Sequence, residues 1–299
     1  MALEEEMIII AGRSHPELAE KIATKLTAPL IKADTKKFAD QELKIQINTQ
    51  LHGEKVVIVQ STSNPANDNL MELLFLVDIA KSAGSNNIIA VIPYFGYSRQ
   101  DRSTGSNDSI SASLVARLLE TSGANMVITL DLHSQKIEKF FKILVQNLDP
   151  TSLFAEIFKD TENAIIVSPD VGGVARARKL ADRLELELAV IDKKRLPSGD
   201  CTMSKVVGEV QGKDCIIIDD ILDTGKTLAK AYELLIEQGA KSVSVCITHP
   251  VFSRDSLELI EKIPFAKIYV TNSIKQSDLP SKIQVIQIAD ILANALLRL

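Results

Sequence analysis

Short runs of β-branched and other apolar residues alternate with longer segments of helical periodicity along almost all of the 299-residue chain. Residues 7–11 form a continuous apolar run that stops at Gly12, as a buried strand does, and residues 16–26 then place Leu18 and Ile22 on one helical face. Repeated strand–helix–strand units predict an α/β fold with a parallel sheet covered by helices on both faces, which binds ligands at the carboxyl ends of its strands. The pattern predicts further strands at 43–47, 56–59, 88–92, 126–130, 164–167, 188–191, 215–218 and 243–247, and further helices at 69–82, 113–119, 174–184 and 227–238.

Two parts of the chain repeat one another. Residues 53–93 and 212–250 each contain a glycine, two charged residues, an apolar strand, a helix, a second glycine and a strand that ends at a proline. Such a repeat indicates two similar α/β domains that arose by duplication. The pattern breaks near 146–151, where Asn-Leu-Asp-Pro interrupts it. We therefore expect domains at 1–147 and 148–299, with the last helix as a candidate to pack back on the first domain.

The net charge of the chain indicates which classes of binding partner are not expected. Thirty-four Lys and Arg residues against 39 Asp and Glu residues give a net charge of −5 and a pI near 5.5. Nucleic acid and anionic membranes are therefore not expected partners, because both require a positive footprint, and a phosphorylated ligand must be bound locally.

Cysteine usage and the termini indicate a compartment. Cys201, Cys215 and Cys246 form no CxxC pair, and their odd number does not suggest a disulfide framework. The N-terminus is acidic where a signal peptide is basic, and the longest apolar stretch, near 88–95, is far too short for a membrane span. We expect a cytoplasmic protein.

The strongest chemical signal lies at residues 216–227, which read Ile-Ile-Ile-Asp-Asp-Ile-Leu-Asp-Thr-Gly-Lys-Thr. An apolar strand delivers Asp219 and Asp220 to its carboxyl end, and a tight loop then opens a helix whose N–H groups and positive dipole end suit a phosphate monoester. The two carboxylates are placed to accept hydrogen bonds from vicinal hydroxyls of a sugar. The alternative is an ordinary strand-to-helix turn with capping residues, although acidic pairs at the end of an apolar strand are costly unless used. A Walker A loop is excluded, because its first glycine would stand five residues before Gly225, where the chain has Asp220.

Two further pairs of polar residues follow apolar runs. Lys193 and Arg195 lie on one side of an extended segment after residues 188–191, where they either bind a charged group or belong to a solvated basic run. His133 and Asp170 each come just past an apolar strand. An imidazole and a carboxylate can hold a divalent ion, although a lone histidine is more often a structural residue. The residues alone leave both alternatives open.

Seven stretches of the chain together resemble a known family. Residues 219–227 look like the phosphoribosyl pyrophosphate (PRPP) loop shared by type I phosphoribosyltransferases and ribose-phosphate pyrophosphokinases, and the other six resemble the pyrophosphokinases specifically. Those six are Phe-Ala-Asp-Gln-Glu at 38–42, Asn-Asp-Asn-Leu-Met-Glu-Leu at 67–73, Pro-Tyr-Phe-Gly-Tyr-Ser-Arg-Gln-Asp-Arg at 93–102, Asp-Leu-His at 131–133, Ser-Pro-Asp-Val-Gly-Gly at 168–173 and Ile-Asp-Lys-Lys-Arg at 191–195. The resemblance covers nearly the whole chain and implies two Rossmann-like domains of the type I phosphoribosyltransferase fold.

The resemblance also implies an activity. Members of the family are kinases of nucleotide biosynthesis that transfer the β,γ-diphosphoryl group of ATP to the anomeric hydroxyl of ribose 5-phosphate, with Mg²⁺, to give PRPP and AMP. Their adenine-binding loop reaches the ATP of a neighbouring subunit, which implies self-association into at least a dimer, and a hexamer by the family pattern.

The implied roles fall on residues of this chain that match the family's motifs. Lys193 and Arg195 match the catalytic residues, which would stabilise charge on the transferred group, and His133 and Asp170 match the magnesium ligands. The ATP-binding set is Phe38, Asp40, Gln41, Glu42, Arg99, Gln100 and Asp101. The ribose 5-phosphate set is Arg195, Asp219, Asp220, Asp223, Thr224, Gly225, Lys226 and Thr227.

Four departures from the family pattern stand out. Gln41 replaces a glycine of the adenine loop, and Lys226 replaces a glycine of the phosphate loop, where glycine-like backbone angles would be strained. Residues 103–109 suit a mobile lid but lack the usual cations. The chain ends at Leu299 without the Ser/Thr-bearing tail of the phosphate-activated members, and His52 replaces an arginine linked to regulation. We expect weak or absent control by phosphate and ADP.

Two alternatives to this function remain open at this point. A phosphoribosyltransferase that consumes PRPP would share residues 219–227, but it has no reason to carry Arg99, Gln100, His133 and Asp170 as well. A catalytically silent regulatory homologue would keep the fold while losing active-site residues, and the retained Lys193 and Arg195 argue against it.

Overall fold

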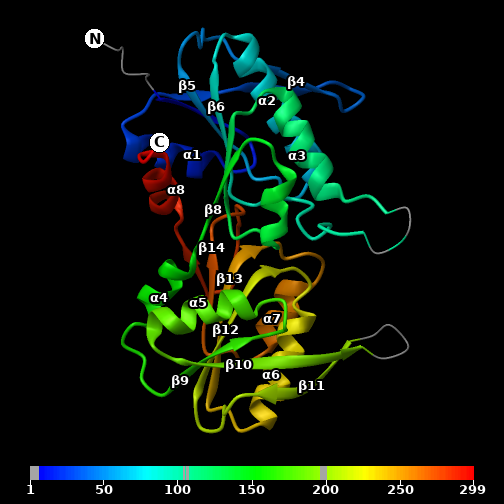
Figure 1. Ribbon diagram of the computed structural model, residues 1–299, viewed down its shortest axis with the longest axis vertical. Coiled ribbons are helices and arrows are strands. Elements are labelled where there is room, and N and C mark those ends of the chain that lie inside the picture. Colours follow the sequence, from blue (N-terminus) through cyan, green and yellow to red (C-terminus); the bar gives the residue numbers. More distant parts are fainter. Residues whose placement is uncertain (1–6, 104, 106–107, 196–200) are drawn as a thin grey trace. The chain divides into compact units, whose positions relative to one another are not determined.

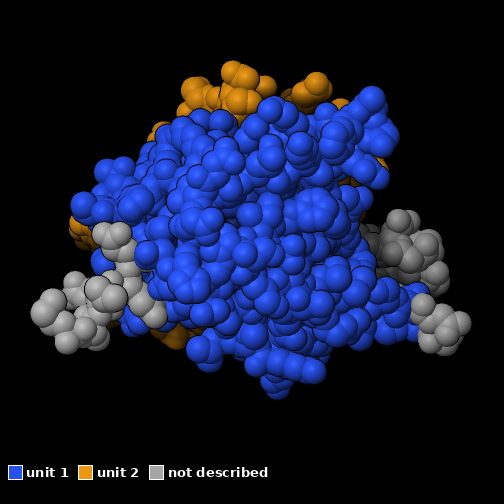
Figure 2. Space-filling view, turned by 90° about the horizontal axis from the view of Figure 1, so that it is seen from above, with its two compact units in different colours: residues 1–148, 273–275, 288–299 blue, residues 149–272, 276–287 orange. Residues whose placement is uncertain are grey.

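The computed structural model describes residues 7–103, 105, 108–195 and 201–299, with only the backbone described at 193–195 and 201–204. The chain divides into two compact units, which are coloured separately in Figure 2. Unit 1 comprises residues 1–148, 273–275 and 288–299, and unit 2 comprises residues 149–272 and 276–287. The chain thus leaves unit 1 after Leu148 and returns to it near its C-terminus.

Unit 1 is built on a parallel sheet with the strand order β2-β1-β5-β6-β7-β8. A separate antiparallel hairpin, β3–β4, projects past helix α2 (Figure 1). The strands are β1 Met7–Ala11, β2 Leu30–Lys32, β3 Asp34–Lys37, β4 Leu43–Gln46, β5 Lys55–Val59, β6 Asn87–Ile92, β7 Met126–Leu130 and β8 Leu144–Leu148.

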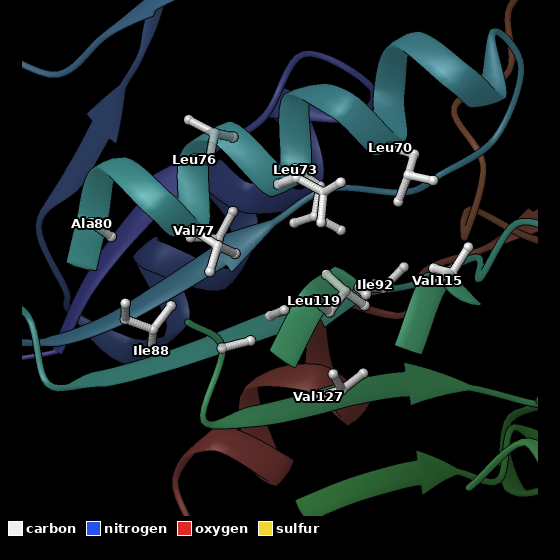
Figure 3. Close-up of a cluster of buried hydrophobic side chains, with 14 of the residues drawn as sticks. Leu70, Leu73, Leu76, Val77, Ala80, Ile88, Ile92, Val115, Leu119 and Val127 are labelled. Atoms are coloured by element: carbon white, nitrogen blue, oxygen red, sulfur yellow. The ribbon is translucent and has the colours of Figure 1, made fainter. Parts of the chain in front are cut away.

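Helices cover both faces of this sheet. On one face, Leu73 and Val77 of α2 and Leu119 of α3 point toward Ile88 and Val127 of the strands (Figure 3). Each buried leucine there contributes ~2 kcal/mol through removal of apolar surface from water. On the other face, α1 packs on β1 and β5 and contacts α8, the last helix of the chain. The helices of unit 1 are α1 Pro16–Leu26, α2 Ala66–Ser82, α3 Ser111–Ser122, the 3₁₀ helix η1 Gln135–Phe140 and α8 Ala289–Leu296.

Unit 2 is built on a sheet with the order β11-β10-β9-β12-β13-β14-β15, in which only β11 is antiparallel to its neighbour among the described strands. Successive residues of each strand face opposite sides: Ile165 and Ile217 pack with helix α6, and Ile166 and Ile216 pack with α4 and α5. The elements are α4 Thr151–Phe158, β9 Ala164–Ser168, α5 Val174–Leu184, β10 Glu187–Arg195, β11 Cys201–Val207, β12 Asp214–Leu222, α6 Lys226–Glu237, β13 Ser242–Pro250, α7 Ser256–Lys262, β14 Ile268–Thr271 and β15 Ile283–Ile286.

The six parallel strands of each unit follow one another in the same spatial order. In both units the first parallel strand along the chain lies between the second and the third, and the fourth, fifth and sixth strands follow the third in order. The repeated glycines occupy the same places: Gly53 N–H donates to Gly84 O at 3.4 Å, and Gly212 N–H donates to Gly239 O at 2.8 Å. All four adopt positive φ, which glycine tolerates without strain. The shared frame confirms two mainly parallel α/β sheets and supports their origin by duplication.

The predicted elements are found, and several others are added. Helices α1 and α5 and strands β1 and β7 have the predicted bounds, whereas β10 and β12 extend four residues beyond the predicted ends at 191 and 218. At 146–151, where the pattern breaks, β8 and α4 are separated by Asp149 and Pro150, and Asp149 accepts hydrogen bonds from Thr151 N and Oγ1 at 2.9 and 2.7 Å. Among the described residues, none of the helices has the length and apolar character needed to cross a membrane.

Candidate active site

The strand order of unit 2 reverses between β9 and β12, which makes the carboxyl ends of these two strands the expected crevice for a ligand. The loop at 168–173 follows β9, and the acidic pair lies near the end of β12. The topology therefore brings Asp170, Asp219 and Asp220 to one edge of one sheet.

The loop after β9 is tight and ordered by its own hydrogen bonds. Ser168 Oγ donates to Asp170 O at 2.6 Å, and Gly173 N–H donates to Asp170 Oδ1 at 3.0 Å. A Cβ atom at Gly173 would lie 2.9 Å from Ser168 Oγ. A larger residue at Gly173 would therefore displace the Ser168 hydroxyl, and the half-buried carboxylate of Asp170 is held at the start of α5.

Arg176 of α5 contacts both members of the acidic pair. Its Nη1 lies 3.6 Å from Asp219 Oδ1 and 3.6 Å from Asp220 Oδ1, and Asp220 N–H donates to Asp219 Oδ1 at 3.0 Å. Burial raises the pKa of Asp219 well above its ordinary value, the carboxylate of Asp220 raises it further, Arg176 opposes the rise, and Asp170 adds a smaller increase. Such a pair gains from hydroxyl donors or a cation supplied by a ligand.

Sequence reasoning missed Arg176. The signal was present, because an arginine in the first turn of the helix after a strand end stands close to the crevice. Asp219 and Asp220 lie on β12, the neighbour of β9 in the sheet. Only the strand order therefore shows that Arg176 meets these two carboxylates.

The phosphate loop ends in an uncapped helix. Gly225 adopts the left-handed conformation, with φ +77°, and α6 begins at Lys226 with no side-chain cap on its first N–H groups. The expectation that Lys226 would be strained is wrong, because Gly225 takes the left-handed position and Lys226 is helical. A Cβ atom at Gly225 would lie 3.2 Å from Ile260 of α7, so that the loop packs against that helix.

Lys193 and Arg195 belong to an arm that extends β10 beyond its pairing with β9. The parallel pairing ends at Val190, and the strand continues antiparallel to β11, with Lys193 opposite Met203 and Arg195 opposite Cys201. The register shifts between Asp192 and Lys193. Such irregularities re-aim side chains at the ends of sheets; the side chains of Lys193 and Arg195 themselves lie outside the described part of the structure.

The corresponding crevice of unit 1 is filled by the chain itself. Gln60 Oε1 accepts hydrogen bonds from Ser14 N and Oγ at 3.0 and 2.7 Å, and its Nε2 donates to Asn69 O at 3.2 Å. Arg13 N and Nε donate to the two carboxylate oxygens of the fully buried Glu72 at 3.1 and 3.0 Å. Unit 1 therefore has the strand frame of unit 2 without its acidic pair.

The residues matched to ATP binding lie on two loops of unit 1. The loop after β6 exposes Arg99 and Gln100 and half-buries Asp101. Gln100 N–H donates to Tyr97 O at 2.9 Å, and the Tyr97 hydroxyl donates to Asn67 of α2. These bonds fix the backbone turn that presents the Arg-Gln pair. Of the predicted lid at 103–109, residues 104 and 106–107 lie outside the described part.

The second loop is the tip of the β3–β4 hairpin. Phe38 is 53% exposed, and Asp40, Gln41 and Glu42 are exposed as well. Phe38 N–H donates to Glu42 O and Gln41 N–H to Phe38 O, each at 2.9 Å, and Gln41 has φ +76°. In a three-residue hairpin loop the last residue takes a left-handed conformation, which favours glycine, and Gln41 occupies that position here. The predicted effect of Gln41 on this loop is therefore one of backbone conformation.

The two residues matched to magnesium lie in different units. His133 is exposed after β7 in unit 1, and Asp170 belongs to unit 2. Within the part of the chain that the structure describes, no three His, Cys, Asp or Glu side chains gather as a preformed metal cluster.

Comparison with known proteins decides the family. The model of the N-terminal domain of ribose phosphate pyrophosphokinase matches residues 7–123, and that of the phosphoribosyl transferase domain matches residues 146–276. The ribose-phosphate pyrophosphokinase of Thermotoga maritima is 42% identical over 304 residues, which cover 100% of this chain and 96% of the relative. The chain belongs to the ribose-phosphate pyrophosphokinase family. The Wolinella succinogenes member is 46% identical over 292 residues, which cover 97% of this chain and 94% of that one.

A solved structure supports the same assignment. Phosphoribosylpyrophosphate synthetase from Mycobacterium smegmatis matches with a TM-score of 0.91 and 35% identity over 97% of both chains. The predicted family, fold class and enzymatic character are thereby confirmed. The match of residues 7–123 to the N-terminal pyrophosphokinase domain distinguishes this chain from the phosphoribosyltransferases.

Proposed function

We propose that this member of the ribose-phosphate pyrophosphokinase family transfers the β,γ-diphosphoryl group of ATP to the anomeric hydroxyl of ribose 5-phosphate. The anomeric oxygen forms a bond to the β-phosphorus, the bond from that phosphorus to the α,β-bridging oxygen breaks, AMP leaves with the bridging oxygen, and the hydroxyl proton is released. The observation that carries the proposal is the juxtaposition in unit 2 of Arg176 with an acidic pair, of which Asp220 is buried and Asp219 half-buried. The phosphate loop follows the strand that carries this pair, and it leads into helix α6, whose first N–H groups have no side-chain cap.

Each part of that crevice suits one part of the sugar phosphate. The N–H groups of Thr224 to Thr227 and the start of α6 suit the 5-phosphate, because a helix N-terminus presents N–H donors and a positive dipole end. Asp219 and Asp220 suit the vicinal hydroxyls, which would supply the donors that a buried acidic pair requires. The sugar is thereby oriented with its anomeric carbon free to react.

Charge neutralisation would dominate the transfer step. Phosphoryl transfer depends mainly on positioning and on cations that stabilise the transferred group. We assign that role to Lys193 and Arg195, supported by their place on the arm of β10, which pairs with β9, the strand that precedes the Asp170 loop. Arg99 and Gln100, with Phe38, Asp40 and Glu42 of the hairpin, are assigned to ATP.

His133 and Asp170 are the residues assigned to Mg²⁺. Each residue has a side chain that could supply one ligand to this ion, with water and phosphate oxygens as the other ligands, which is how Mg²⁺ is usually held at phosphate sites. Bound at the ATP phosphates, the ion would supply charge neutralisation.

We also propose self-association into at least a dimer, with a hexamer as the family pattern. Helices α2 and α3, which contact each other, expose Met71, Phe75, Leu114 and Leu118 by 42, 36, 44 and 37%, spaced four residues apart on each helix. Such an apolar patch supports a protein interface. Sedimentation of Leu114→Glu against the wild type tests this, with a smaller species as the expected result.

A cytoplasmic location is proposed as well. Cys215 and Cys246 are free and buried, and burial raises the pKa of Cys215 to about 12 and that of Cys246 further. Unpaired, unreactive thiols are typical of proteins in reducing compartments.

The proposal is tested by a ³¹P NMR time course with MgATP and ribose 5-phosphate. A new pair of diphosphate doublets alongside AMP is the expected result, and chelation of Mg²⁺ with EDTA should abolish it. Lys193→Ala should lower kcat by about a hundredfold or more, as the loss of one transition-state donor does. Lys194→Ala is the matched control, because it removes the same positive charge at the adjacent position of the chain.

Other outcomes would contradict the proposal. Release of ADP would show an ordinary kinase that attacks the γ-phosphorus. Binding of ribose 5-phosphate without turnover would show a catalytically silent homologue.

A further inference from the structure

The loop after β13 is bound to the first residues of the phosphate loop. Val251 and Phe252 both donate their N–H groups to Leu222 O at 3.0 Å, and Ser253 N–H donates to Asp223 O at 3.2 Å. The side chain of Ser253 adds a further bond, because its hydroxyl donates to Asp223 Oδ1. Ser253 therefore contacts Asp223 through both its main chain and its side chain.

The backbone on both sides of Ser253 adopts a disfavoured conformation. Phe252 has φ +46° and Arg254 has φ +54°, although neither is glycine. Non-glycine residues hold such angles only where surrounding contacts determine them, and these positions gather at functional sites. Here the surrounding contacts are the bonds to Leu222 and Asp223, together with Ser256 N–H to Ser253 O at 3.3 Å.

Helix α7, which follows this loop, also supports the phosphate loop. Its Ile260 lies where a Cβ atom at Gly225 would be 3.2 Å away. Lys282 Nζ fixes the end of the helix by donating to Ile260 O, Glu261 O and Ile263 O at 2.6, 2.7 and 2.9 Å. The phosphate loop is therefore held by the loop at 251–255 at its first residue and by α7 at Gly225.

We propose that Ser253 is a positioning residue for ribose 5-phosphate, which acts by fixing the carboxylate of Asp223. Asp223 is the single acidic residue between Ile221 and Thr227. A carboxylate at the start of a loop that wraps a phosphate repels the anion unless its direction is fixed. The Ser253 hydroxyl ties that carboxylate to the loop after β13, and so keeps the acid in one orientation relative to the N–H groups of α6.

This inference deepens the proposed function and rests on it. The test compares Ser253→Ala with Ser253→Thr, which keeps the hydroxyl, and with Ser256→Ala. Ser256 is buried three residues further along, and its hydroxyl has no hydrogen-bond partner in the described part of the chain, so that it controls for disturbance of the loop. Initial rates of AMP formation give KM for ribose 5-phosphate at saturating MgATP, and KM for ATP at saturating ribose 5-phosphate.

Ser253→Ala should raise KM for ribose 5-phosphate about tenfold, the size of effect expected for a lost hydrogen bond to a charged group. KM for ATP should change less than about twofold, because the contact belongs to unit 2, whereas the residues assigned to ATP belong to unit 1. Ser253→Thr and Ser256→Ala should behave as the wild type. In an Asp223→Ala background, which has no side-chain acceptor for the Ser253 hydroxyl, the Ser253→Ala effect should disappear, because the two residues act as one unit.

Three results would overturn the inference. These are equal changes in both KM values, an effect as large in Ser256→Ala, or an effect of Ser253→Ala that persists in the Asp223→Ala background. A wild-type chain that forms no AMP would instead overturn the proposed function. Calorimetric titration of the same variants with ribose 5-phosphate then decides the inference separately, with about tenfold weaker binding by Ser253→Ala as the supporting result.

Discussion

Gln60 of unit 1 stands at the position that Asp219 holds in unit 2. In unit 1, Lys55 pairs with the first residue of β1, and Gln60 lies five residues after Lys55. In unit 2, Asp214 pairs with the first residue of β9, and Asp219 lies five residues after Asp214. The Gln60 side chain turns into its own crevice and satisfies Ser14, whereas Asp219 forms half of a buried acidic pair. One strand frame thus supports a filled crevice in unit 1 and a candidate sugar-phosphate crevice in unit 2.

Gln60→Ala should destabilise unit 1 without affecting catalysis. The change removes hydrogen bonds to Ser14 N, Ser14 Oγ and Asn69 O from a fully buried site. A loss of ~2–4 kcal/mol is expected from buried groups left without partners. Amide hydrogen exchange at Ser14 should accelerate and the thermal midpoint should fall, while KM for ribose 5-phosphate stays unchanged. Gln211→Ala, at an exposed glutamine of unit 2, is the control, and a loss of ribose 5-phosphate binding by Gln60→Ala would contradict a filled crevice.

Asp219→Asn should stabilise the fold near neutral pH while it weakens ribose 5-phosphate binding. The pKa of Asp219 is raised above its ordinary value of 3.8 by burial and by Asp220. As pH rises above that value, the unfolded chain loses the proton while the folded chain retains it, so that the wild type loses stability through that window. Asparagine does not ionise, so that the Asp219→Asn protein does not lose stability in this way.

The difference in thermal midpoint between Asp219→Asn and the wild type should therefore grow as pH rises from about 4. The measurement is a series of thermal melts in EDTA. Asp182→Asn, at an exposed carboxylate of α5, should show no such trend. A pH-independent difference would show that the gain does not come from ionisation.

Arg176→Met should lower kcat/KM for ribose 5-phosphate by about ten- to a hundredfold, because it leaves the half-buried Asp219 and the buried Asp220 without their cation. Arg176→Lys should recover much of this loss, since it keeps the charge that lies 3.6 Å from Asp219 and Asp220. Arg178→Met, at an exposed arginine of the same helix, is the control. Steady-state kinetics with ribose 5-phosphate varied provide the measurement, and equal effects of Arg176→Met and Arg178→Met would contradict the role of Arg176.

Gln41→Gly should make the β3–β4 hairpin tip more stable. Gln41 holds φ +76°, which costs a non-glycine residue ~1 kcal/mol. Hydrogen exchange at the Phe38 and Gln41 amides, which close the turn, should slow by about threefold or more. Ala39→Gly, at a neighbouring position without positive φ, should speed the same exchange because it adds backbone freedom. Faster exchange in Gln41→Gly would show that the left-handed position is not the source of strain.

The local pattern of the sequence predicts the elements whose signals are contained within them. Helices α1 and α5 have the predicted bounds, because an apolar stripe with helical spacing specifies a helix that buries one face. Strand β1 likewise follows from a continuous apolar run that stops at Gly12. The motif at 219–227 identified the acidic pair and the phosphate loop without any knowledge of the strand order.

The tertiary structure decided which side chains meet across elements. Ser253 reaches Asp223 from 30 residues away, and Gln60 reaches Ser14 from 46 residues away. Periodicity records which face of an element is buried, but it carries no information about which distant loop covers that face. The conformation of Lys226 was likewise not predictable from the sequence pattern. Gly225 adopts the left-handed conformation in the loop, and Lys226 is the first residue of helix α6.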